Sequence, residues 1–141
     1  MKLDIGVPEL RSLLDAPSPA TLTVYRDRAD AITSPVWFRV AGDAFEVVVA
    51  IGDHKLGHLR RDSRCILVIF EASRPFRGVE VRGRATLVPD EGAQARLAIA
   101  SRYLGLEDGR AYADRARQAP GFVVRLPVSA ARGWSLNDKL P

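Results

Sequence analysis

The spacing of short β-forming runs constrains the fold of this chain more than any other feature of its sequence. Runs rich in valine, isoleucine, threonine and aromatic residues recur along the 141 residues, and each is shorter than a typical helix. Short connections join most of these runs, and helical segments are inserted rather than alternating with strands. This order favours an antiparallel barrel with appended helices over a parallel α/β sheet. The six predicted strands are 21–25, 32–40, 45–50, 66–70, 79–87 and 122–126.

One local pairing is predicted from turn chemistry. Residues 41–43 read Ala-Gly-Asp between two β-rich runs, so 32–50 is predicted to form a hairpin. In 79–87, small or apolar residues alternate with polar and charged ones, so that strand is expected to have one buried and one wet face.

Helical periodicity marks the remaining segments. Asp53 is placed to cap the second of them, Gly105 stops the third, and Pro120-Gly121 ends the fourth. After the sixth strand, 132–137 is predicted to be a tail with an exposed Trp134. The predicted helices are 8–14, 53–61, 89–103 and 106–118.

Size and composition indicate one domain over residues 1–141, with no linker dividing it. No stretch has the apolar length of a secretory signal or a membrane span, so a soluble, cytoplasmic protein is expected. The single cysteine, Cys65, has no internal disulfide partner and adjoins the apolar run 66–70, which predicts a small buried core residue.

Charge points weakly to an anionic partner. The net charge is +4, and 18 of the 21 basic residues are arginine. Arginine favours bidentate contacts with phosphate, although genome composition also produces such a bias. The charges are spread along the chain without the blocks typical of nucleic-acid-binding arms, so no nucleic-acid partner is expected. His54 and His58 are four residues apart but lack a third ligand nearby, so no metal site is predicted.

Three stretches in order, 33–38, 53–64 and 79–85, resemble the pyridoxamine-5′-phosphate-oxidase-like split barrels, particularly the actinobacterial flavin and deazaflavin oxidoreductases. The resemblance implies a mainly β (α+β) fold, a split antiparallel β-barrel of the FMN-binding type. It also implies a homodimer that holds F420 or FMN at its interface, with contacts from both chains to each cofactor.

In that family the cofactor phosphate lies where a hairpin strand meets the short helix, and Lys55 matches the lysine that holds it. A helix N-terminus and a lysine in its first turn both favour an anion there. Gly52 leaves room for the phosphate, and His54 is a neighbouring polar side chain. Several relatives have serine or threonine where this chain has Asp53. A carboxylate at this position repels a phosphate, unless Asp53 caps the helix and points away from the site. The alternative for Lys55 is a solvated helix residue.

The resemblance implies further cofactor contacts. Trp37 is expected either to lie beside the ring system or to fill the barrel, and Arg77 either to meet an anionic group or to remain on the surface. Trp134 either crosses to the other subunit or docks on its own barrel. Arginines after Lys55 either form a groove for the F420 tail or make a solvated helix face; they are Arg60, Arg61 and Arg64. The remaining predicted contacts are Ser34, Val36, Val48 and Val49.

The activity implied is hydride transfer to a small organic acceptor, with F420 slightly favoured over FMN. No acid–base constellation stands out, so no catalytic residue is nominated, as suits chemistry carried by a cofactor. One alternative is a non-catalytic flavin-, haem- or tetrapyrrole-binding protein. Another is a barrel that binds some other ligand or protein without a redox cofactor.

Overall fold

The structure, a computed structural model, describes residues 4–141, which form four α-helices, nine strands and three short 3₁₀ segments. The helices are α1 (Pro8–Asp15), α2 (His54–Arg61), α3 (Gln94–Leu104) and α4 (Leu106–Ala116). The strands are β1 (Ala20–Tyr25), β2 (Ala31–Val36), β3 (Arg39–Ala41), β4 (Ala44–Ala50), β5 (Arg64–Phe70), β6 (Gly78–Arg84), β7 (Thr86–Pro89), β8 (Gly121–Pro127) and β9 (Ala131–Trp134). The 3₁₀ segments are η1 (Glu91–Ala93), η2 (Val128–Ala130) and η3 (Asn137–Lys139).

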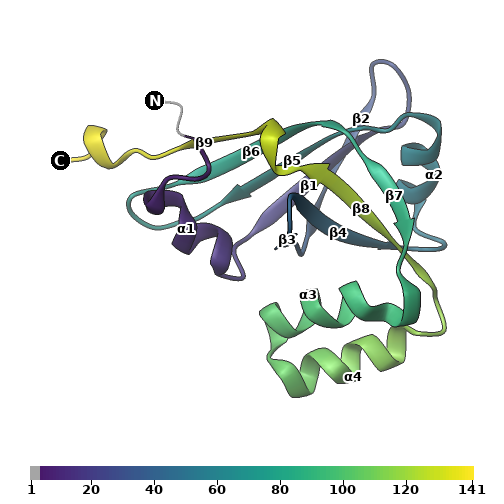
Figure 1. Cartoon of the computed structure of the whole chain (residues 1–141). Coiled ribbons are helices and arrows are strands. Elements are labelled where there is room, and N and C mark those ends of the chain that lie inside the picture. Colours follow the sequence, from purple (N-terminus) through teal and green to yellow (C-terminus); the bar gives the residue numbers. More distant parts are fainter. Residues whose placement is uncertain (1–3) are drawn as a thin grey trace.

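The strands form two antiparallel sheets (Figure 1). One has the order β2-β1-β5-β6-β9 and the other the order β3-β4-β8-β7. The chain passes from the first sheet to the second at two places, between β2 and β3 through Trp37 and Phe38, and between β6 and β7 through Ala85. These two corners let one chain build both sheets around a shared core.

The core lies between the inner faces of the two sheets. Alternate residues of β1 and β5 point into it, including Leu22 and Leu67, both almost fully buried. Phe38 and Phe45 fill it from the second sheet and its corner, with ring centroids 6.5 Å apart. Burial of each such side chain stabilises the fold by about 1.5–3 kcal/mol.

The helical hairpin α3–α4 lies beside the strands, with its two helices side by side (Figure 1). The Asp90 carboxylate accepts hydrogen bonds from the backbone N–H groups of Ala95 and Arg96, at 2.8 and 3.0 Å, and so starts α3. Gly105, with φ 87°, ends α3 and turns the chain into α4. Within residues 4–141, no helix has both the length and the apolar composition that crossing a lipid bilayer requires.

The predicted hairpin over 32–50 is wrong in its first half. β2 pairs with β1, and only the short β3 pairs with β4. At the break, the Phe38 N–H donates to the Tyr103 hydroxyl and the Phe38 carbonyl accepts from Arg102. Because α3 takes these backbone groups, they do not continue a strand ladder. The predicted strand 79–87 is likewise divided at Ala85, whose N–H donates to the Ser63 carbonyl at 2.8 Å.

The prediction of a C-terminal tail with an exposed Trp134 is also wrong. Residues 131–134 form β9, which pairs with β6, and Trp134 is half-buried. Its indole occupies the space above Gly78, where a β-carbon would overlap the ring. With β9 and the two divided strands, the predicted six strands become nine.

Cys65 is buried as predicted, with 1% of its surface exposed, and burial raises the pKa of its thiol to about 12. A thiol that stays protonated and covered is a poor nucleophile. We therefore expect negligible reaction of the native protein with a thiol-specific aromatic disulfide at pH 8, and one thiol released per chain after unfolding in guanidinium chloride. Rapid reaction of the native protein would show that β5 opens locally.

Candidate functional site

A cavity of about 780 Å³ lies where β1, β2, β4, the start of α2 and the α3–α4 hairpin meet. Its volume is that of a small-molecule or cofactor site. Most of its lining is apolar or aromatic, and three charged side chains enter it. The lining residues are Pro17, Pro19, Ala20, Thr21, Pro35, Val36, Trp37, Val48, Ala50, Asp53, Lys55, Phe70, Arg96, Ile99, Tyr103 and Tyr112.

Stacked aromatic rings form one wall of the cavity. The Trp37 indole lies 5.2 Å from the Tyr103 ring at an interplanar angle of 13°, and the Tyr112 ring is tilted against Trp37 with its centroid 5.3 Å away. The Tyr103 hydroxyl donates to the Ser18 carbonyl at 2.8 Å and accepts from the Phe38 N–H at 3.3 Å. Burial raises the pKa of Tyr103, so the phenol stays neutral. This wall offers a fixed flat surface to a planar ring.

Lys55 enters the cavity as half of an ion pair with Asp53. One Asp53 carboxylate oxygen accepts the Lys55 N–H at 2.9 Å, which caps α2 as predicted, and the other lies 2.8 Å from the Lys55 ammonium nitrogen. Burial alone raises the pKa of Asp53, but the hydrogen bonds and charge of Lys55, with the charge of His54, outweigh burial and lower it. Asp53 does not point away from the site, because it also lines the cavity. An anion that binds the Lys55 ammonium group therefore lies close to the Asp53 carboxylate, which shares that group.

Arg96 supplies the third charged side chain, and sequence reasoning missed it. It is 6% exposed and donates from Nη1 to the carbonyls of Ala116 and Ala119, at 2.7 and 2.9 Å. The spacing of residues in the sequence could have indicated Arg96, because Arg96, Ile99 and Tyr103 share one helix face at i, i+3 and i+7. A charged residue on an otherwise apolar stripe marks a special environment.

Four predicted cofactor residues come together in this cavity: Val36, Trp37, Val48 and Lys55. Ser34 lies two residues before Val36 in β2, and its buried hydroxyl has no hydrogen-bond partner among residues 4–141. Val49 points into the core on the other face of β4, with 2% exposed. The cofactor contacts predicted for these six residues remain predictions.

Gly52 and His54 line a separate, smaller hollow with Asp53, Gly57, His58 and Arg61. The two histidines are therefore close together, as their spacing predicts. In the part of the chain that the structure describes, no group of three or more His, Cys, Asp or Glu residues is arranged to hold a metal ion.

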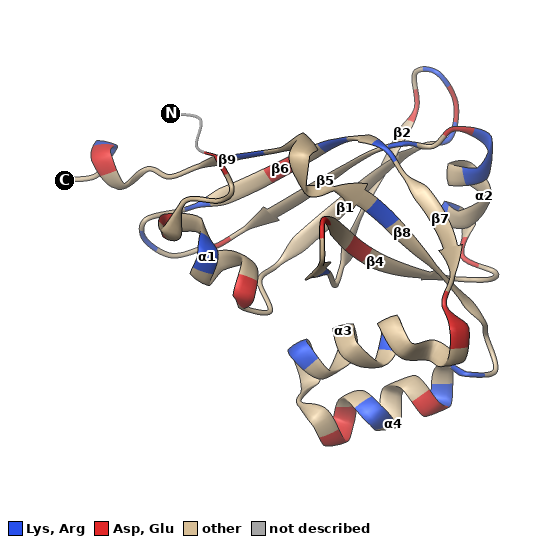
Figure 2. Cartoon of the chain, viewed as in Figure 1, with Lys and Arg blue, Asp and Glu red and all other residues tan. Residues whose placement is uncertain are grey.

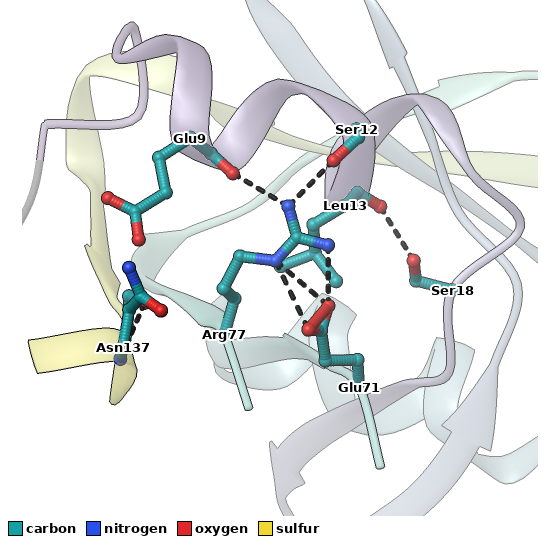
Figure 3. Close-up of polar contacts among 8 residues, drawn as sticks. Glu9, Ser12, Leu13, Ser18, Glu71, Arg77 and Asn137 are labelled. Carbon is teal, nitrogen blue, oxygen red and sulfur yellow. Dashed lines mark hydrogen bonds and ion pairs between the residues drawn. The ribbon is translucent and has the colours of Figure 1, made fainter. Parts of the chain in front are cut away.

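Arg77 lies away from the cavity and joins the β5–β6 connection to α1 (Figure 3). It forms a two-pronged ion pair with Glu71, the shorter contact being 2.7 Å. It also donates to the Glu9 carbonyl at 2.7 Å and the Ser12 hydroxyl at 2.6 Å. Trp134 likewise lines no part of the cavity in this chain. The structure of one chain therefore does not place either residue at the cavity.

The basic residues are scattered over α2, the helical hairpin and several strands rather than gathered on one face (Figure 2). Arg60 lies over the Phe122 ring, Arg61 contacts His58, and Arg64 pairs with Asp62 at 2.6 Å while stacking on Tyr25. None of these arginines lines the cavity.

Comparisons with known proteins agree with this architecture. A family model described as Pyridoxamine 5′-phosphate oxidase matches residues 7–135. Among curated proteins, none matches the chain significantly in sequence.

Solved structures share the fold at low sequence identity. The conserved hypothetical protein Rv2991 of Mycobacterium tuberculosis is 20% identical with a TM-score of 0.76, over 94% of this chain and 87% of that one. An F420 reductase is 21% identical with a TM-score of 0.62, over 86% and 94%. A FAD- and heme-binding protein of Mycobacterium smegmatis is 16% identical with a TM-score of 0.68, over 95% and 72%. The predicted split antiparallel β-barrel with appended helices is therefore confirmed.

Proposed function

The chain belongs to the pyridoxamine 5′-phosphate oxidase family, and from this membership we propose that it is an oxidoreductase that binds F420 or FMN in the 780 Å³ cavity. The bound cofactor would supply hydride transfer to a small organic acceptor. One observation carries the proposal: a stacked aromatic wall and a lysine at the start of a helix face the same cavity. The similarity to an F420 reductase supports F420 as one of the two candidates.

The protein's part in this chemistry is to hold, orient and shield the cofactor. Trp37 and Tyr103 offer the flat surface for a ring system, and Lys55 offers the charge for a phosphate. The N–H groups of Lys55 and Leu56 already bond to Asp53, so the phosphate contact falls on the Lys55 ammonium group rather than on those amides.

The homodimer is part of the proposal and is supported by the outward face of the larger sheet. Thr21, Pro35 and Phe70 lie on this face and also line the cavity. Ile66 and Val68 continue it as half-buried apolar side chains. A second copy packed on this face would bury that apolar surface and close the cavity from outside.

A second candidate is a non-catalytic protein that binds a flavin or haem. The similarity to a FAD- and heme-binding protein favours it. Neither histidine of the chain is among the lining residues of the cavity, so a haem bound there would need another axial ligand, such as a tyrosine. Oxidation of the reduced, bound cofactor by an added organic acceptor would separate the oxidoreductase from a protein that only stores the cofactor.

Replacement of Lys55 tests the site. We expect Lys55→Ala to weaken binding of the preferred cofactor by about tenfold or more, since loss of one charged contact costs about 1.4 kcal/mol. Titration of F420 and of FMN, followed by tryptophan fluorescence, measures this effect, and Trp37 lies in the cavity to report it. Lys139→Ala, which removes an exposed lysine in η3, is the matched control. The proposal fails if neither cofactor binds, or if Lys55→Ala binds as tightly as the native protein.

A further inference from the structure

Arg96 is a buried cation without an anionic partner. Its side chain is almost fully enclosed, and it forms no ion pair with any carboxylate among residues 4–141. Arginine stays protonated in proteins, so the guanidinium group carries its charge in this enclosed position. Removing a charge from water without neutralising it is unfavourable. The cavity beside Arg96 is therefore a place where a negative charge is stabilised.

The hydrogen bonds of Arg96 leave one edge of its guanidinium group available. Nη1 uses both of its hydrogens on the carbonyls of Ala116 and Ala119, which end α4 and the turn after it. These two hydrogen bonds cap the C-terminal end of α4 and use two of the five N–H donors of the guanidinium group. In residues 4–141, Nε and Nη2 have no hydrogen-bond partner. These two atoms form the edge that binds a carboxylate or phosphate with two parallel hydrogen bonds.

The surrounding backbone leaves space for this guanidinium group. At Gly121, the first residue of β8, a β-carbon would lie 2.8 Å from Arg96 Nη2 and 2.8 Å from Val48 Cγ1. The Gly121 backbone is not in the left-handed region, so the glycine is needed for room rather than for conformation. Gly121 pairs with Ala50, which lines the cavity. The absence of a side chain at Gly121 thus lets the guanidinium group lie close to the β8 backbone at the edge of the cavity.

We propose that Arg96 binds the carboxylate or phosphate group of the organic acceptor, and that the acceptor is therefore an anionic molecule with an apolar or aromatic body. This inference rests on the proposed function, since it assigns the substrate class of the same cavity. Lys55, on α2, is the cation assigned to the cofactor, whereas Arg96 lies on α3 in line with Ile99 and Tyr103. The mostly apolar lining of the cavity suits an apolar or aromatic acceptor body beside the cofactor.

Small aromatic anions test the proposal without any cofactor. In a Trp134→Phe background, Trp37 is the sole tryptophan and reports binding in the cavity. We expect benzoate and phenyl phosphate to quench its fluorescence with at least tenfold greater affinity than the neutral benzyl alcohol. Arg96→Gln should abolish that preference, and Arg96→Lys should retain part of it. Arg110→Gln, which removes an exposed charge from α4, should bind like the parent. Equal affinity for the charged and neutral probes overturns the proposal.

Two further measurements distinguish an acceptor site at Arg96 from a cofactor site. Arg96→Gln should bind F420 or FMN within about twofold of the parent; an equal tenfold loss would assign the anion site to the cofactor and overturn the acceptor assignment. Failure of the proposed function itself would appear instead as unchanged cofactor binding in Lys55→Ala. If Arg96→Gln does not fold, the anomalous signal of 4-bromobenzoate in crystals of the native protein locates the probe. Its carboxylate against Arg96 supports the proposal, and any other position refutes it.

Discussion

Replacement of Gly109 by valine is expected to destabilise the protein by about 3 kcal/mol, the upper end of the usual cost of overpacking. Gly109 is a buried residue of α4 at the contact with α3. A β-carbon there would lie 2.6 Å from both the N and the Cα of Ser101. These are backbone atoms, so α3 and α4 would have to move apart rather than a side chain rotate away.

Gly57→Val provides the matched control, because Gly57 is also a helical glycine but has nothing within 4 Å of an added β-carbon. Valine and glycine differ by only a few tenths of a kcal/mol in helix propensity, so this variant should stay within about 0.5 kcal/mol of the native protein. Urea unfolding followed by circular dichroism measures both free energies of unfolding. Equal effects at the two glycines would show that the close α3–α4 contact is not required.

Gly109→Val should also change the shape of the cavity. Tyr103 comes from α3 and Tyr112 from α4, and both pack against Trp37. Moving the helices apart separates these rings, so we expect Gly109→Val to weaken binding of any ligand that stacks on this wall. Gly57→Val leaves the wall unchanged.

Local sequence patterns predicted most of the individual elements. The Asp53 cap of α2 and the stop at Gly105 depend on neighbouring residues only, and both are present. The division of 32–40 could not be predicted in this way, since its whole length has β-forming composition. The break at Phe38 is made by Tyr103 and Arg102, about 65 residues further along the chain. Corners between sheets are tertiary features, so the local sequence carries little sign of them.

The residues of the candidate site also fall into those that the sequence predicted and those that depend on tertiary contacts. Val36, Trp37 and Lys55 lie in stretches that resemble the family, Val48 lies in the strand between those stretches, and the structure brings all four to one cavity. Arg96, Tyr103 and Tyr112 reach it from the inserted helices, whose docking depends on non-local contacts. The i, i+3, i+7 spacing on α3 identifies a shared face, but spacing alone does not say what that face packs against.

Arg102→Met is expected to destabilise the protein by about 3 kcal/mol, since a half-buried guanidinium group here holds backbone carbonyls from two distant segments. Its Nε donates to the Phe38 carbonyl at 3.1 Å, and its Nη2 donates to the carbonyls of Leu14 and Ala16 at 3.1 and 2.9 Å. Leu14 and Ala16 belong to the C-terminal end of α1, where carbonyls lack helical partners. Removing a charged donor from several such groups costs about 1–3 kcal/mol for each one that water does not reach.

The functional consequence follows from where those carbonyls lie. Phe38 is next to Trp37, and the segment after Ala16 contributes Pro17 and Pro19 to the cavity. We therefore expect Arg102→Met to lower affinity for F420 or FMN in addition to stability, with partial recovery in Arg102→Lys, which keeps the charge but reaches fewer carbonyls. Arg110→Met, at an exposed position of α4, should change neither the free energy of unfolding nor the affinity. If Arg102→Met lowers stability but leaves cofactor affinity unchanged, the hydrogen bonds of Arg102 support the fold without shaping the cavity. A shift of the Phe38 and Ala16 segments changes affinity only if these segments form part of the binding wall.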